Sequence, residues 1–117
     1  MSWSIDYYED ARGRKPVCIF IDGLLPKHAK KAVDQIRLLC DYADLGQSHP
    51  DASEEGDGIW KLRVRFGKSQ YRFFYFSATG QKFILVHAYL KSSPKTPPQE
   101  FAQAKKNRDE WLARKKP

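Results

Sequence analysis

The stretch from residue 59 to residue 76, IWKLRVRFGKSQYRFFYF, limits the possible folds more than any other part of the chain. Its first half alternates apolar side chains with basic ones. The apolar positions are Trp60, Leu62, Val64 and Phe66, and the basic positions are Lys61, Arg63 and Arg65. Because successive side chains of a strand point to opposite faces, this alternation predicts a strand with one face on a core and a cationic face opposite.

The residues that follow predict two more strands, joined by tight turns. Residues 67–70, GKSQ, predict a hairpin turn, and 71–76 form the returning strand, in which Arg72 shares a face with Phe74 and Phe76. A second turn at 78–81 contains Gly80, and residues 83–90 are apolar on both faces, as in a strand that is covered on both sides. Together these segments predict a three-stranded antiparallel meander.

Helical periodicity appears before and after the meander. An amphipathic pattern from Pro26 to near Gly46 predicts a helix. A final helix is predicted to end near Ala113, with Thr96 as its N-cap, Pro97 at its first position and Gln99 completing a capping box. Residues 16–24 are short and apolar, and they fit either a helix or a strand.

The remaining segments complete the predicted architecture. Residues 2–8 alternate like a short strand, and residues 47–58 are polar and acidic and predict a loop. We therefore expect one domain over residues 1–117 of class α+β, a small antiparallel sheet of the N-terminal strand plus the meander, packed with two or three helices.

Charge is distributed unevenly along the chain. Residues 1–57 carry 7 Lys and Arg against 11 Asp and Glu, whereas residues 58–117 carry 14 against 3, so the second half has a net charge of +11. A basic face that meets a polyanion accounts for this asymmetry. A solvated basic surface without a partner is the alternative.

Composition also limits where the protein is expected to act. The longest apolar runs, residues 17–21 and 83–86, are far shorter than the roughly 20 residues that span a membrane, and the first residues do not predict a signal peptide. Cys18 and Cys40 both lie in apolar patterns, so two free buried thiols and a cytoplasmic location are predicted.

The side chains available for chemistry are mainly arginine and lysine. His28, His49 and His87 lie far apart and lack the spacing of a metal site, and His87 is interpreted as a hydrogen-bonded core residue. The basic residues of adjacent strands can converge on one sheet surface: Arg63, Arg65, Arg72, Lys91 and Lys95. Such a cluster suits a phosphate backbone and the charge of a phosphorane, with tyrosine or phenylalanine stacking on bases.

Three stretches carry a resemblance to a known family: YYEDARGRKPV, GIWKLRVRFGKSQYRFFYF and LVHAYLKSSPKTPPQEFAQAKK. They resemble the HigB-like branch of the RelE toxin superfamily, the toxins of type II toxin–antitoxin modules, often found in phage-derived loci. The resemblance implies a ribosome-dependent mRNA endoribonuclease in which the ribose 2′-hydroxyl attacks the phosphate without a metal or cofactor. It also implies a helix-turn-helix antitoxin as partner in a hetero-oligomer.

The resemblance assigns roles to particular residues. Arg63, Arg72 and Lys91 are the predicted catalytic residues. Lys61 is a predicted RNA-binding residue on the same ground, and the basic and aromatic pattern of the strands and turns adds Arg65, Lys68, Tyr71 and Lys95. Where some relatives place a tyrosine near the last helix this chain has Phe101, so Tyr71 or Tyr89 is a candidate substitute and no general base is assigned.

Other interpretations remain open from the sequence. The basic surface can belong to a non-enzymatic RNA- or ribosome-binding module, or to a degenerate, inactive toxin. Arg63 can be a solvated cross-strand neighbour, and Arg72 can pair with Glu9 or Asp10 to stabilise the fold.

Overall fold

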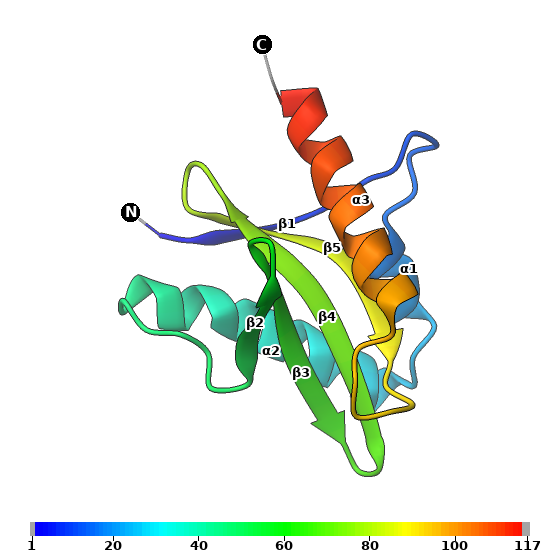
Figure 1. Ribbon diagram of the computed structural model, residues 1–117. Coiled ribbons are helices and arrows are strands. Elements are labelled where there is room, and N and C mark those ends of the chain that lie inside the picture. The colour runs from blue at the N-terminus through cyan, green and yellow to red at the C-terminus, as the bar shows by residue number, and fades with distance from the viewer. Residues whose placement is uncertain (1, 116–117) are drawn as a thin grey trace.

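Five strands and three helices make up residues 2–115 in a computed structural model of the protein (Figure 1). The strands are β1 (Ser4–Tyr7), β2 (Ala52–Gly56), β3 (Ile59–Phe66), β4 (Ser69–Ala78) and β5 (Lys82–Leu90), and the helices are α1 (Pro16–Asp22), α2 (Pro26–Asp44) and α3 (Pro98–Lys115). The predicted α+β class is confirmed, and the ambiguous segment after residue 15 forms a helix.

All five strands belong to one sheet, in the order β1-β5-β4-β3-β2. Strands β3, β4 and β5 form the predicted antiparallel meander. The expectation of a wholly antiparallel sheet is wrong at β1, which pairs in parallel with β5 from Ser4 opposite Lys82 to Tyr7 opposite Leu85. The intervening elements carry the chain back across the sheet, which a parallel pairing requires.

The predicted loop at residues 47–58 contains a strand, so that prediction is wrong. Strand β2 pairs antiparallel with the start of β3, and Asp57 and Gly58 form the connection with φ angles of 53° and 78°. Two positive φ values in a two-residue Asp-Gly connection are typical of a hairpin turn that matches strand twist. The strand lies at the sheet edge, where polar side chains are tolerated.

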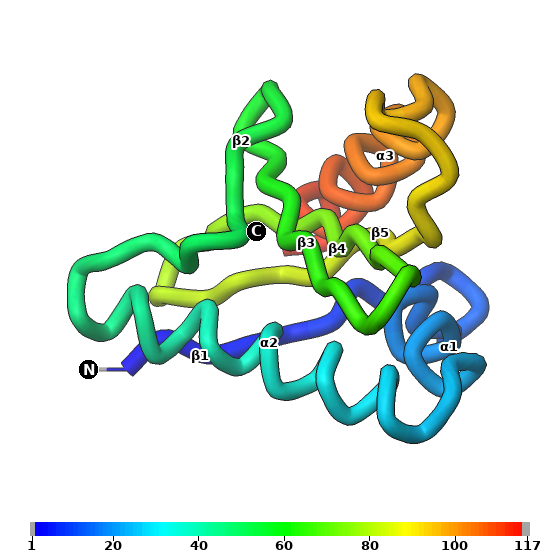
Figure 2. Tube along the Cα trace, turned by 90° about the horizontal axis from the view of Figure 1, so that it is seen from below, coloured from blue at the N-terminus to red at the C-terminus, as the bar shows by residue number. Residues whose placement is uncertain are grey.

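The helices cover both faces of the sheet. Helices α1 and α2 lie on one face and α3 lies on the other (Figure 2). Helix α3 begins at Pro98, and the Thr96 hydroxyl donates to Glu55 Oε1 at 3.0 Å, so the predicted capping box is wrong.

Each face of the sheet has its own hydrophobic core. The core under α1 and α2 includes Ile36, Leu62 and Phe73, and the core under α3 includes Ile59 and Phe74; the exposed fraction of all five is 0%. As predicted, the alternating side chains of β3 lie on opposite faces of the sheet, with Leu62 and Val64 in the core under α1 and α2. Trp60 and Trp111 pack at the borders of these clusters. Cys18 and Cys40 are free thiols, as predicted, but only Cys40 is buried, and Cys18 is half-buried.

Within residues 2–115, no helix combines the length and apolar character that crossing a bilayer requires.

Candidate functional site

Strand pairing gathers basic side chains on the face of the sheet that α3 covers. Arg63 on β3 lies directly opposite Arg72 on β4, and Arg72 lies opposite Tyr89 on β5. Side chains that oppose each other across neighbouring strands have Cβ atoms about 5 Å apart, and like charges at such positions are destabilising. Two arginines at these positions lower the stability of the sheet, which points to a role in binding rather than in folding.

Among residues 2–115, the buried Arg72 side chain has no acidic partner. Its exposed fraction is 4%, one terminal nitrogen donates to the Tyr89 hydroxyl at 3.0 Å, and the other donates to the Pro94 carbonyl at 3.3 Å. The buried Nε atom has no hydrogen-bond partner in residues 2–115. Pairing with Glu9 or Asp10, the alternative that the sequence left open, does not occur. A buried cation without a counter-charge is costly, so this group is suited to an incoming anion.

A bulge in β5 decides which side chains accompany Arg72. The register of β4 and β5 shifts by one residue at Val86. Leu85 therefore packs in the core under α1 and α2, whereas Tyr89 packs in the core under α3. Without the extra residue, strict alternation would place Leu85, His87 and Tyr89 on one face.

The bulge also orients His87 on the α3 face. His87 Nε2 lies 2.8 Å from Glu100 Oε1, and its ring stacks on Phe74 with centroids 6.2 Å apart and on Tyr89 with centroids 6.5 Å apart. The imidazole is half-buried rather than enclosed. It is hydrogen-bonded, as predicted, but it borders a surface pocket that the sequence did not indicate.

Glu55 on β2 connects two parts of the site. Its Oε1 atom lies 3.0 Å from Lys61 Nζ and accepts the hydrogen bond from Thr96 in the segment that precedes α3. Both charged side chains are largely shielded, with exposed fractions of 16% for Lys61 and 22% for Glu55. The charge of Lys61 is thus balanced within the fold, whereas that of Arg72 is not.

The remaining predicted basic residues lie around this centre. Arg63 is 38% exposed and its guanidinium is 3.9 Å from Asp51, a distant ion pair. Lys91 is half-buried, two residues beyond Tyr89. Its backbone N–H donates to the backbone carbonyl of Gln70, which extends the β4–β5 ladder. The exposed positions are Arg65, Lys68 and Lys95.

Tyr71 is the one predicted site residue on the opposite face. Its exposed fraction is 6%, and it packs in the core under α1 and α2. Its hydroxyl is hydrogen-bonded to His28 Nδ1, and its ring makes an edge contact with Phe20. The structure does not bring Tyr71 to the Arg72 cluster, whereas Tyr89, the other candidate tyrosine, lies beside Arg72.

The arrangement can bind and stabilise a phosphate group. We use "Arg72 cluster" for Arg63, Arg72, Tyr89 and Lys91, whose backbone positions share the α3 face of three adjacent strands, while the Arg63 guanidinium extends toward Asp51. Guanidinium groups remain charged at every working pH and donate in pairs to planar anions. In residues 2–115, no three His, Cys, Asp or Glu side chains group in a way that could hold a metal ion.

Comparison with protein families places the chain in a family of phage-derived proteins. The family model described as "Phage derived protein Gp49-like (DUF891)" matches residues 20–109, which include α2, the whole meander and most of α3. No curated protein matches the chain. The matched range contains every residue of the Arg72 cluster.

Proposed function

We propose that this chain, which belongs to the Gp49-like family of phage-derived proteins, is the toxin of a type II toxin–antitoxin module that cuts messenger RNA on the ribosome. The family is a toxin-like family of the toxin–antitoxin type. The endoribonuclease activity, its dependence on the ribosome and the relation to HigB-like toxins are the parts that we propose.

The observation that carries the proposal is the unneutralised guanidinium of Arg72. A protein that needed this cation only for stability would place a carboxylate beside it, because a buried charge without a partner costs several kcal/mol in order-of-magnitude terms. Here the neighbours are a hydroxyl and a carbonyl, and one nitrogen has no partner in residues 2–115. An RNA phosphate supplies the missing negative charge.

In the proposed reaction the ribose 2′-oxygen attacks the adjacent phosphorus while its proton is removed. The bond from phosphorus to the 5′-oxygen then breaks, and that oxygen takes up a proton, which leaves a 2′,3′-cyclic phosphate and a 5′-hydroxyl. Arg63 and Arg72 offer donors to the phosphoryl oxygens, whose negative charge increases in the transition state. Lys91 offers a further positive charge at the end of the same row.

The proposed partners follow from the same surface. We propose that a helix-turn-helix antitoxin covers the basic face and forms a hetero-oligomer with the toxin in the cytoplasm. A partner that places acidic side chains over Arg63 and Lys91 would block RNA and compensate the charge of the cluster.

The test is primer-extension mapping of a message in a reconstituted translation reaction, with and without ribosomes. We compare the wild-type protein with Arg63→Ala, and use Arg37→Ala, an exposed position on α2, as the control that removes the same charge. We expect cuts that need ribosomes, that Arg63→Ala reduces at least about 100-fold and that Arg37→Ala leaves unchanged. An intact message in the presence of folded wild-type protein and ribosomes would contradict the proposal.

A non-enzymatic RNA- or ribosome-binding module is the second candidate. Two observations favour it: the Glu55 carboxylate already neutralises Lys61, and Phe101, which cannot transfer a proton, packs half-buried beside Gly56. In that case the wild-type protein binds ribosomes in the same reaction, and the message stays intact.

A further inference from the structure

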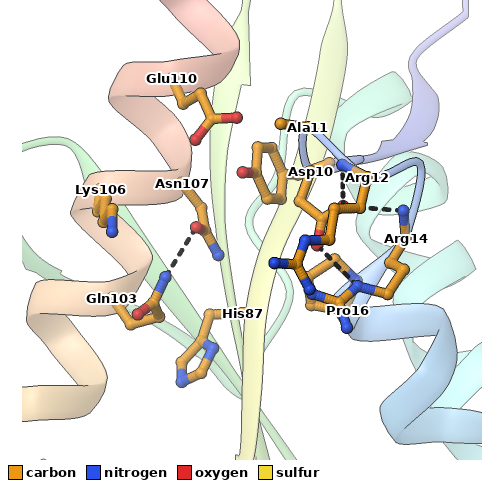
Figure 3. A pocket seen from close by; sticks show the side chains of 11 residues that line it. Asp10, Ala11, Arg12, Arg14, Pro16, His87, Gln103, Lys106, Asn107 and Glu110 are labelled. Carbon is orange, nitrogen blue, oxygen red and sulfur yellow. Dashed lines mark hydrogen bonds and ion pairs between the residues drawn. The ribbon is translucent and has the colours of Figure 1, made fainter.

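A pocket of 440 Å³ is enclosed by three segments: the loop that joins β1 to α1, the strand β5 and the helix α3 (Figure 3). Its walls include Arg12 and Arg14 from the loop, His87 from β5, and Gln103 and Lys106 from α3. Figure 3 shows the loop arginines extending from one wall toward the His87 side of the pocket. Apart from His87, these residues have no part in the site described above.

The loop that carries the two arginines is held in a fixed turn. One oxygen of the Asp10 carboxylate accepts the backbone N–H groups of Arg12 and Arg14, each at 2.9 Å, and the other accepts Arg14 Nε at 3.2 Å. These hydrogen bonds, led by the one from the Arg14 backbone, lower the pKa of Asp10. Gly13 has a φ of 80°, which a residue with a side chain rarely adopts, and it closes the turn. The guanidinium groups are therefore presented by a preorganised segment.

The charges around the pocket favour an anion. The nearby carboxylates are already engaged: Asp10 within its own turn, Glu100 with an imidazole and Glu110 with a guanidinium of the same helix. Within residues 2–115, in contrast, the side chains of Arg12 and Lys106 form no ion pair with any carboxylate. Two cations thus face the pocket without a counter-charge.

An apolar surface adjoins the cationic one. A second cavity shares Asp10, Arg14 and His87 with the first and continues over Phe20 and Ala88. One end of the combined groove suits a phosphate, and the other suits the flat face of a base. Stacking on apolar and aromatic surface beside a basic groove is the usual way of holding single-stranded nucleic acid.

We propose that this groove binds one nucleotide of single-stranded RNA adjacent to the nucleotide at the Arg72 cluster. The two sites are continuous along β5, because the His87 ring lies 6.5 Å from the Tyr89 ring and the Tyr89 hydroxyl accepts from Arg72. The choice of RNA as the ligand rests on the proposed function. An acidic protein segment would also satisfy the cations, but the joined apolar wall and the continuity with the Arg72 cluster favour a nucleotide.

The test measures binding of a 2′-O-methyl oligonucleotide by fluorescence anisotropy at several salt concentrations. This probe lacks the attacking hydroxyl and cannot be cut by the proposed reaction, so its binding does not depend on activity. The double variant Arg12→Ala/Lys106→Ala is compared with Lys27→Ala/Lys82→Ala, two exposed lysines outside both sites that carry the same total charge. All four side chains are exposed, so both variants are expected to fold.

We expect the Arg12→Ala/Lys106→Ala variant to bind about tenfold more weakly, and its salt slope to fall by about 1.4, because each contact with a single-stranded phosphate contributes about 0.7. The Lys27→Ala/Lys82→Ala variant should change affinity less than about threefold. A 4-thiouridine label should crosslink to residues 8–16 or 103–110.

Equal weakening in the two variants, crosslinks confined to β3 and β4, or more effective competition by polyglutamate than by RNA of the same charge would each overturn the proposal. Cleavage on ribosomes that persists alongside any of these results would leave the proposed function intact. Selective weakening without cleavage would support the groove and contradict the nuclease.

Discussion

Replacing Arg72 with methionine should remove activity and leave the fold as stable as before or more stable. The guanidinium is 4% exposed, and its two hydrogen bonds go to neutral acceptors on Tyr89 and Pro94. Methionine has a similar length and fills irregular space without a charge. The substitution therefore removes an unpaired buried charge while it keeps most of the packing.

The expected magnitude follows from three contributions. Loss of two hydrogen bonds from a charged donor costs about 3–6 kcal/mol. Removing the desolvation penalty of an unpaired ion returns several kcal/mol, roughly 4–5, and burial of the methionine side chain adds about 1.5–3 kcal/mol. At the midpoints of these ranges, gains of about 6.8 kcal/mol against a loss of about 4.5 kcal/mol favour the Arg72→Met variant by about 2 kcal/mol. At about 3–5 °C per kcal/mol for a domain of this size, Tm should rise by roughly 6–10 °C.

The assay is thermal unfolding followed by circular dichroism, with Arg37→Met, an exposed position, as the control for a general effect of the new side chain. We expect a raised Tm for Arg72→Met and little change for the control. A fall of more than about 3 °C for Arg72→Met would refute the reasoning, because it would mean that the fold itself compensates the charge.

Three further predictions concern His49, Glu55 and Phe73. Burial lowers the pKa of His49, whose Nδ1 accepts a backbone N–H, so the unfolded chain binds the proton more readily and the free energy of unfolding should fall as pH drops below about 6.5. His49→Gln should flatten this dependence in urea unfolding at pH 5, 6 and 7, and an equal fall of stability with pH in the variant and the wild-type protein would argue against it. Glu55→Gln should release the charge of Lys61 and steepen the salt dependence of oligonucleotide binding by about 0.7, whereas an unchanged slope would show that Lys61 does not reach RNA. Phe73→Ala should cost about 3–5 kcal/mol in the free energy of unfolding measured with urea, because the ring is fully buried on the central strand, and a loss below about 1 kcal/mol would contradict its place in the core.

The central part of the fold was predictable from local pattern. The alternation in residues 59–66 places Leu62 and Val64 in one core, and the pairing of the meander then brings Arg63 and Arg72 opposite each other. Strand β2 was missed because its sequence, ASEEG, lacks the apolar alternation of a half-buried strand. The Asp57-Gly58 dipeptide was the available signal, since it is typical of a hairpin turn.

The candidate site was predictable only in outline. Its basic residues were recognised, but their partners come from a hairpin that was not predicted or from segments that are distant in sequence. The unpredicted hairpin brings Glu55 to both Lys61 and Thr96. The Thr96 hydroxyl, which was expected to cap α3, therefore donates to Glu55 instead. No spacing rule links positions 41 residues apart before the sheet is assembled.

Two properties of the site depend on details that residue pattern does not encode. The position of Tyr89 on the Arg72 face results from the one-residue bulge at Val86, which period-two reasoning cannot detect. The surroundings of Arg72 include the segment before α3, because one guanidinium nitrogen donates to the Pro94 carbonyl, 22 residues along the chain.

The most direct test of the account is single-turnover cleavage of ribosome-bound message by the wild-type protein and by Arg72→Met, with analysis of the new ends. We predict that the wild-type protein produces 2′,3′-cyclic phosphate and 5′-hydroxyl ends, and that the folded variant cuts at least about 100-fold more slowly. Cleavage by Arg72→Met at the wild-type rate, or a message left intact by folded wild-type protein, would contradict the claim that the unpaired guanidinium serves catalysis on RNA.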